Sequence, residues 1–251
     1  ARQDGMKGSF LGPSYSQSEI EKRLAAAGAK FDVFADDELL EKTVDALDGG
    51  QAVGWFQGRM EFGPRALGNR SILGDPRKPD MQRQLNLKIK YRESFRPFAP
   101  SVPVEDLADY FELDCESPYM TFVAEVRKER RRAMTSAEQT LFGIEKLNIP
   151  RSDIPAVTHV DYSARIQTVH KETNPRYHAL LEAFKRRTGC SVLVNTSFNI
   201  RGEPIVCTPE DAFRCFMGTS MELLVAGDCI LRKDEQKAVA NEDYLKAFEL
   251  D

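Results

Sequence analysis

The chain has 251 residues, 41% of them hydrophobic and 29% charged, and its 35 Lys and Arg against 39 Asp and Glu give a formal net charge of −4. This length suits a globular protein of one or two domains and excludes a small peptide or a disordered tail. The negative net charge argues against indiscriminate binding to nucleic acid or to anionic membranes.

The first fifty residues predict two amphipathic helices. Ser16 and Glu19 form a capping box for the first helix, and Asp36 is placed to cap the second. We expect residues 1–50 to be an N-terminal helical segment that packs on a main domain over residues 51–232.

The main domain begins with a predicted strand, a loop and a helix. The strand covers residues 52–56 and leads into a glycine-rich loop at 61–77. A helix is expected over 79–89, because apolar residues recur there at four-residue steps. Two prolines within 98–104, preceded by Pro97, predict an extended or edge strand.

The remaining chain alternates between predicted strands and helices, with one interruption. Residues 127–150 begin with a basic run and predict a surface insertion; a solvated face is the ordinary interpretation and a phosphate-tracking patch is the alternative. Residues 233–251 predict a polar C-terminal tail helix. Further strands are expected at 120–126, 157–160, 165–169, 191–194 and 222–231, and further helices at 175–187 and after the Thr208 capping box.

The loop at 61–77 has the composition of an anion site. Glycines let backbone amides approach a ligand, and guanidinium groups make paired, charge-assisted hydrogen bonds to phosphate or carboxylate. Positive charge is local: from Arg59 to Arg96, ten Lys and Arg stand against four acids, a window of +6. A plain basic surface loop is the alternative.

Three further segments carry candidate polar residues. Lys90, Arg92 and Arg96 lie on a stiff, proline-containing stretch, where cations can stabilise charge on a reacting phosphoryl group. Asn195, Thr196, Ser197 and Asn199 follow a buried strand, a position where ligands gather in open sheets, although they could be simple turn formers. Asp161, Ser163 and Arg165 lie in a bend, and His159 beside them is interpreted as structural.

Absent motifs narrow the chemistry. The sequence has no phosphate-binding P-loop, serine nucleophile elbow, dinucleotide fingerprint or zinc-protease motif. The five cysteines form no Cys-x-x-Cys pair, and no histidine lies at metal-ligand spacing from them, so neither a zinc site nor a disulfide framework is expected. No membrane-spanning run or signal pattern is found, which predicts a cytoplasmic protein. What remains is electrostatic positioning of phosphorylated substrates.

Four motifs in fixed order resemble the C-terminal domain of the NodU/CmcH-type O-carbamoyltransferases. They run from Phe62 to Leu73, Arg92 to Pro100, Asp161 to Thr168 and Asn195 to Ile205. The resemblance implies an α/β fold of the α+β type: a YrdC-like twisted mixed sheet with flanking helices around a basic concave cavity. The insertion at 127–150 matches none of these motifs.

The resemblance also implies an activity. ATP with Mg²⁺ and carbamoyl phosphate would form carbamoyl-adenylate, with release of pyrophosphate and phosphate. A preceding ATPase-like, metal-containing domain would then pass the carbamoyl group to a substrate hydroxyl on a sugar, an antibiotic or another compound. Nothing in this chain, which begins at Ala1 rather than Met, corresponds to that domain. We therefore expect one incomplete part of a longer protein, with no protein-bound transition metal of its own.

The resemblance assigns roles to particular residues. Lys90, Arg96 and Ser197 would be catalytic. Arg70 and Arg201 are further candidates without an assigned role. The residues implied to bind carbamoyl phosphate and ATP are Arg65, Met120, Thr121, Arg165, Asn195 and Asn199.

Two other functions stay open at this stage. A nucleic-acid-binding YrdC-like module would show strongly salt-dependent binding, but the basic window lacks the interleaved aromatic residues of a stacking platform. A catalytically idle docking domain would tolerate Lys90→Ala and Ser197→Ala without loss of activity. Small molecules are the expected partners; neither nucleic acid nor membrane is, and homodimer formation is left open.

Overall fold

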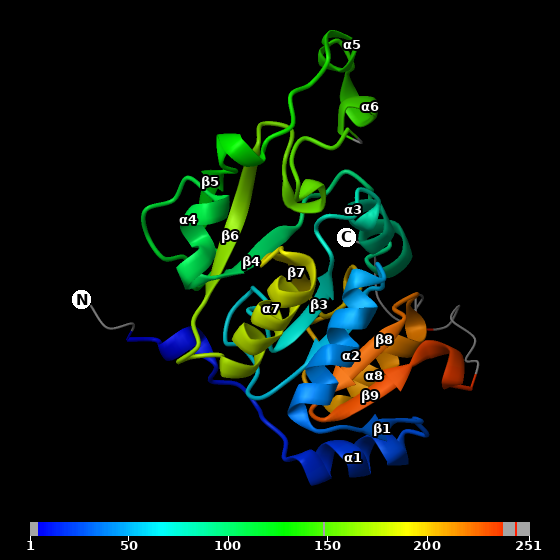
Figure 1. Ribbon diagram of the computed structural model, residues 1–251. Coiled ribbons are helices and arrows are strands. Elements are labelled where there is room, and N and C mark those ends of the chain that lie inside the picture. Colours follow the sequence, from blue (N-terminus) through cyan, green and yellow to red (C-terminus); the bar gives the residue numbers. More distant parts are fainter. Residues whose placement is uncertain (1–4, 148, 238–243, 245–251) are drawn as a thin grey trace.

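The computed structural model describes residues 5–147, 149–237 and 244, and a mixed sheet forms its centre (Figure 1). The strand order is β1-β9-β8-β2-β3-β7-β4-β6-β5, in which β2 pairs parallel with β8 and β4 parallel with β6, while the other pairs are antiparallel. The predicted α/β class with a mixed sheet is confirmed. The strands are β1 (Asp32–Val33), β2 (Val53–Phe56), β3 (Arg70–Gly74), β4 (Ala99–Pro103), β5 (Phe122–Glu125), β6 (Ser163–Val169), β7 (Leu193–Ser197), β8 (Leu223–Ala226) and β9 (Cys229–Arg232).

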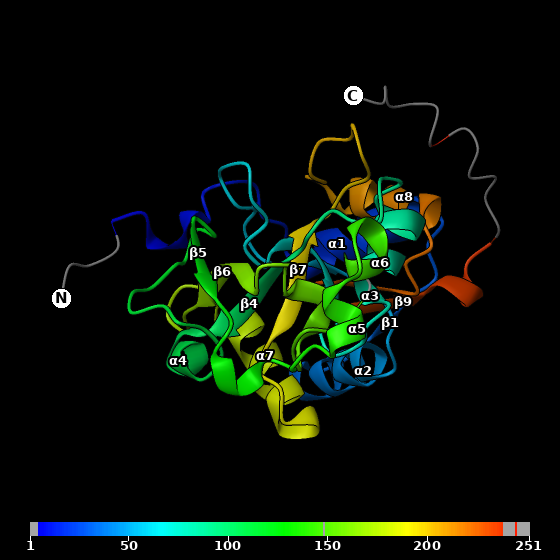
Figure 2. The same ribbon diagram turned by 90° about the horizontal axis from the view of Figure 1, so that it is seen from above.

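Helices flank this sheet on both sides. α2 and α7 pack together on one face, and α1 and α8 pack together on the other, as the view from above shows (Figure 2). Large side chains such as Trp55, Phe184 and Phe198 are fully buried in the resulting core. The helices are α1 (Gln17–Ala26), α2 (Asp36–Asp48), α3 (Met81–Gln84), α4 (Leu107–Tyr110), α5 (Ser136–Gln139), α6 (Gly143–Leu147), α7 (Pro175–Thr188) and α8 (Pro209–Gly218), and a π-helical turn covers Leu85–Ile89.

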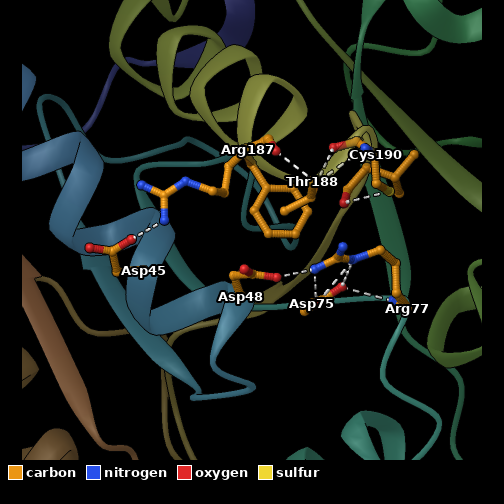
Figure 3. Close-up of polar contacts among 9 residues, drawn as sticks. Asp45, Asp48, Asp75, Arg77, Arg187, Thr188 and Cys190 are labelled. Atoms are coloured by element: carbon orange, nitrogen blue, oxygen red, sulfur yellow. Dashed lines mark hydrogen bonds and ion pairs between the residues drawn. The ribbon is translucent and has the colours of Figure 1, made fainter.

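Ion pairs fasten α2 to its neighbours (Figure 3). Arg187 at the end of α7 pairs with Asp45 at 2.5 Å, and Arg77 after β3 bridges Asp48 of α2 and the buried Asp75. The Arg77 guanidinium also lies 5.2 Å from the ring centre of Phe184. Arg77, one of the arginines of the predicted anion loop, therefore has a structural role on the α2 side of the sheet.

Local hydrogen bonds made several helices predictable. Both bonds of the Ser16–Glu19 capping box are present, as are those of the Thr208–Asp211 box of α8. α7 ends at Gly189, which adopts φ of +75°. The expected cap at Asp36 is wrong, because α2 begins with that residue and Ala35 precedes it without a side-chain cap.

Four strand predictions need correction. The loop at 61–77 contains β3, which is buried between β2 and β7. Residues 157–160 form no strand, since a 3₁₀ turn covers Pro155–Val157. The strand expected over 222–231 is the hairpin of β8 and β9. The segment 1–50 contributes β1, the strand at one end of the sheet, in addition to helices.

β4 is an interior strand, although its prolines predicted an edge. It pairs with β7 through Ala99 to Ser101 and with β6 through Ser101 to Pro103. Only Ser101 is in register with both neighbours, so Pro100 and Pro103 are each in register with one strand. This offset lets a residue without an amide hydrogen occur in an interior strand.

The segment 127–150, predicted as a surface insertion, projects from the body and carries α5 and α6 (Figure 1). Its arginines are bound to acids, which favours a solvated, salt-bridged face over a phosphate-tracking patch. The shortest of these ion pairs join Arg130 to Asp153, Arg131 to Glu125 and Arg132 to Glu138. Of the predicted tail helix at 233–251, residues 238–243 and 245–251 lie outside the described residues; a 3₁₀ turn covers Lys233–Glu235.

Gly68 is where the glycine-rich loop meets α7. Its φ is +103°, and a Cβ atom there would lie 2.2 Å from the Tyr177 ring. We expect Gly68→Ala to lower the free energy of unfolding by about 1–3 kcal/mol more than Gly63→Ala. Gly63 also has a positive φ but faces open space. The difference between the two variants therefore measures the steric clash of the new Cβ with Tyr177. Urea unfolding of both variants tests this, and equal losses would contradict it.

Candidate functional site

Two adjoining cavities open where the loop after β2, the start of β5 and the end of β7 meet. One measures about 130 Å³ and the other about 560 Å³, and four residues line both: Pro64, Arg65, Met120 and Arg165. The smaller cavity is further lined by Ala66, Arg92, Pro97, Phe98, Ala99, Asn195, Thr196 and Ser197. The larger is further lined by Met6, Ser9, Phe62, Gly63, Leu67, Tyr119 and Thr121.

Three arginines line these cavities. Among the described residues, no carboxylate lines either cavity, and no ion pair involves Arg65, Arg92 or Arg165. The Arg165 Nε is buried and has no hydrogen-bond partner in the part of the chain that the structure describes. Burial together with nearby Arg65 lowers the pKa of Arg165. Converging, unneutralised guanidinium groups of this kind favour an anionic ligand.

The backbone amides of the glycine-rich loop already have a ligand. The buried Glu61 Oε1 accepts hydrogen bonds from the amides of Leu67, Asn69 and Arg70 at 2.7, 2.7 and 3.2 Å. These three amides are therefore occupied by a carboxylate of the chain itself. Their carboxylate partner instead fixes the loop that carries Arg65 to the cavity wall.

Arg70 does not join the site. It is fully buried, its guanidinium carbon lies 3.6 Å from the ring centre of Phe56, and it donates to the carbonyl of Gln57 at 2.6 Å. Burial lowers its pKa to about 10. Its role is to hold the loop to β2.

The end of β7 supplies a second wall. Asn195 Nδ2 donates to Gln167 Oε1 at 2.7 Å and to the Ala66 carbonyl at 3.2 Å, while its buried Oδ1 has no partner among the described residues. Gln167 Nε2 in turn donates to the Leu67 carbonyl at 2.8 Å. Gln167 lies within one of the four motifs, yet sequence reasoning did not select it.

Lys90 lies behind this wall rather than in it. Its buried Nζ is 2.5 Å from the Ser197 carbonyl, 3.1 Å from Ser197 Oγ, 2.9 Å from the Asn199 carbonyl and 2.7 Å from Asn199 Oδ1. Burial and the neighbouring Arg92 lower the pKa of the amine to about 7. Ser197 Oγ donates to Asn199 Oδ1 at 2.7 Å. Lys90 thus fixes the turn that presents Ser197 to the smaller cavity.

The predicted site residues are only partly brought together. Arg65, Met120, Arg165, Asn195 and Ser197 line the smaller cavity, and Thr121 lines the larger. Met120 adopts φ of +54°, a strained backbone of the kind that gathers at functional sites.

Arg96 and Asn199 lie outside both sets of lining residues. Arg96 is exposed and pairs with Glu93 at 3.1 Å, and Arg201 lies 3.8 Å from the same carboxylate. Arg92, between Lys90 and Arg96, reaches the cavity instead. The sequence named Arg92 among three candidate cations, but the resemblance gave it no role.

The described residues offer neither a cluster of metal ligands nor a membrane-spanning helix. No group of three or more His, Cys, Asp or Glu side chains there could hold a metal ion. No helix in that part of the chain has both the length and the apolar character needed to cross a membrane.

Comparison with known proteins connects the chain to several longer ones. The family model for the carbamoyltransferase C-terminus matches residues 44–233. The chain is 61% identical over 251 residues to the uncharacterized protein sll1178 of Synechocystis, covering 99% of this chain and 41% of that protein. It is 40% identical over 228 residues to the nodulation protein NolO of Bradyrhizobium diazoefficiens, covering 89% and 38%.

The chain is also similar to an O-carbamoyltransferase and to one solved structure. The chain is 40% identical over 190 residues to the 3'-hydroxymethylcephem-O-carbamoyltransferase of Amycolatopsis lactamdurans, covering 76% of this chain and 32% of that protein. Among solved structures, full-length HypF in its phosphate- and nucleotide-bound form matches with a TM-score of 0.49 and 14% identity, over 76% of this chain and 25% of that one. The chain spans 41% or less of the length of each of these relatives.

Proposed function

The chain belongs to the carbamoyltransferase C-terminal family, and from that membership we propose that it binds ATP and carbamoyl phosphate and forms carbamoyl-adenylate. The observation that carries the proposal is the convergence of Arg65, Arg92 and Arg165 on cavities whose described walls contain no carboxylate. Two phosphorylated substrates need such a surplus of positive charge.

The two cavities suit different parts of the substrates. The larger has apolar and aromatic walls, including Phe62, Leu67 and Tyr119, as is typical of a site for a flat organic group. We assign the nucleoside to it and carbamoyl phosphate to the smaller, more polar cavity. Arg65 and Arg165 line both cavities and would face the phosphates where the two substrates meet.

The proposed reaction has two steps. Water releases carbamate and phosphate from carbamoyl phosphate; a carbamate oxygen then attacks the α-phosphorus of ATP, and the bond to the β-phosphate breaks to release pyrophosphate. The arginines would neutralise the phosphate oxygens and hold the reactants in line. Ser197 would bind the carbamoyl or phosphate group, and Lys90 would hold Ser197 in place. Arg96, which lies outside both cavities, is assigned no step in this scheme.

Magnesium belongs to the substrate in this scheme. The described cavity walls offer no carboxylate cage, so Mg²⁺ would arrive bound to ATP. The relatives are longer than this chain, and the name of the Amycolatopsis relative specifies a hydroxymethyl acceptor. We therefore propose that a further, ATPase-like N-terminal domain passes the carbamoyl group to a substrate hydroxyl. A cytoplasmic location is a prediction from the sequence, and homodimer formation is left open.

Pyrophosphate release tests the proposal. The protein is incubated with ATP and Mg²⁺, with and without carbamoyl phosphate, and AMP and pyrophosphate are quantified. We expect equal amounts of both products, formed only when carbamoyl phosphate is present. Formation of ADP instead, or AMP formation that is independent of carbamoyl phosphate, would contradict it.

A further inference from the structure

Arg92 lines the smaller cavity, and two contacts hold its guanidinium in place. Its Nε donates to Asn86 Oδ1 at 2.7 Å, and its guanidinium carbon lies 5.1 Å from the ring centre of Phe98. Among the described residues, no hydrogen bond or ion pair uses its two terminal amino groups. Burial and nearby Arg96 lower the pKa of Arg92 to about 10, so it keeps its charge at neutral pH.

Asn86 is the residue that fixes this orientation. It is fully buried in the π-helical turn before Lys90, and its Nδ2 donates to the carbonyls of Ser94 at 3.1 Å and Arg96 at 2.8 Å. The Arg92 amide also donates to the Asn86 carbonyl at 3.0 Å. One buried amide therefore ties together both ends of the segment that carries Arg92. π-helical turns of this kind are frequent at functional sites.

The lining of the cavities separates Arg92 from the other two arginines. Arg65 and Arg165 line both cavities, whereas Arg92 lines only the smaller one. We propose that Arg92 contacts the phosphate of the anion bound in the smaller cavity, and that Asn86 is the positioning residue for it. The identity of this anion as carbamoyl phosphate rests on the proposed function.

Kinetics with each substrate varied separately test the assignment. We expect Arg92→Ala to raise KM for carbamoyl phosphate by about ten- to a hundredfold, the effect of losing a hydrogen bond between charged groups, with little change in KM for ATP. Arg92→Lys should be intermediate, because it keeps the charge but loses the fork and the bond to Asn86. Asn86→Ala should raise the same KM by a smaller factor.

Arg83→Ala is the matched control, since Arg83 is an exposed arginine on neighbouring α3 that does not line the smaller cavity. It should leave both KM values unchanged. Thermal unfolding of each variant verifies that it is folded. If Arg92→Ala is unfolded, Arg92→Lys still tests the proposal. Equal changes in KM for the two substrates, or no change in KM for carbamoyl phosphate in folded variants, would overturn the proposal.

Calorimetric titration with inorganic phosphate separates this proposal from the proposed function. We expect the wild type and Arg83→Ala to bind phosphate equally, and Arg92→Ala to bind it about ten- to a hundredfold more weakly. This result would support the anion site even if no pyrophosphate were released. Unchanged phosphate affinity in Arg92→Ala, or no binding to the wild type, would overturn the assignment of Arg92.

Discussion

Lys90→Met is expected to reduce carbamoyl-phosphate-dependent pyrophosphate release by at least about a hundredfold, because displacement of a reacting group by an ångström has an effect of that size. The Lys90 Nζ contacts four oxygen atoms of Ser197 and Asn199, and methionine can donate to none of them. The turn that presents Ser197 should therefore shift. Loss of donors to these partly buried oxygens should also lower the free energy of unfolding by about 3 kcal/mol.

Steady-state kinetics and urea unfolding measure both effects. Lys88→Met is the matched control, since Lys88 is exposed and only two residues away on the same segment. It should change neither quantity. Activity within a few-fold of wild type in Lys90→Met would show that the turn at Ser197 does not depend on this amine.

Arg165→Ala is expected to have the second large effect. Arg165 lines both cavities, its Nε is buried without a partner in the described chain, and Arg65 is near enough to affect its pKa. Removing one group that stabilises charge in a transition state typically reduces kcat by about a hundred- to a thousandfold. We expect a loss of that size, together with higher KM values for both ATP and carbamoyl phosphate.

The effect on the KM values of the two substrates distinguishes Arg165 from Arg92. Varying each substrate at saturation of the other gives both KM values. Arg214→Ala, an exposed arginine of α8 paired with Asp211, is the control and should behave as wild type. If Arg165→Ala raised only one KM value, Arg165 would act on only one of the two substrates, and the prediction would be wrong.

Local interactions explain which parts of the fold were predictable. The capping boxes at Ser16 and Thr208 and the glycine after α7 involve residues a few positions apart, so the sequence displays them directly. β3 was missed because a strand buried between two others does not need alternating polarity, and it begins with Arg70. β4 was assigned to an edge because the offset of its two neighbours cannot be seen locally.

The sequence predicted which types of residue form the site better than it predicted where their side chains lie. Motif resemblance selected Arg65, Arg165 and Ser197, which line the smaller cavity although they are far apart in the chain. Side-chain direction could not be predicted: Arg70 points back to Phe56, while Arg65 in the same loop lies at the cavity. Likewise Arg96 pairs with Glu93 outside the lining, whereas Arg92, four residues earlier, lines the smaller cavity.

A crystal structure of the protein with a non-hydrolysable ATP analogue and carbamoyl phosphate would test the central claim most directly. We predict the phosphate of carbamoyl phosphate within hydrogen-bonding distance of Arg65, Arg92 and Arg165 in the smaller cavity, with the adenosine in the larger one. Density for both ligands away from these arginines, or an adenosine in the smaller cavity, would contradict the claim that these adjoining cavities are where the two substrates meet.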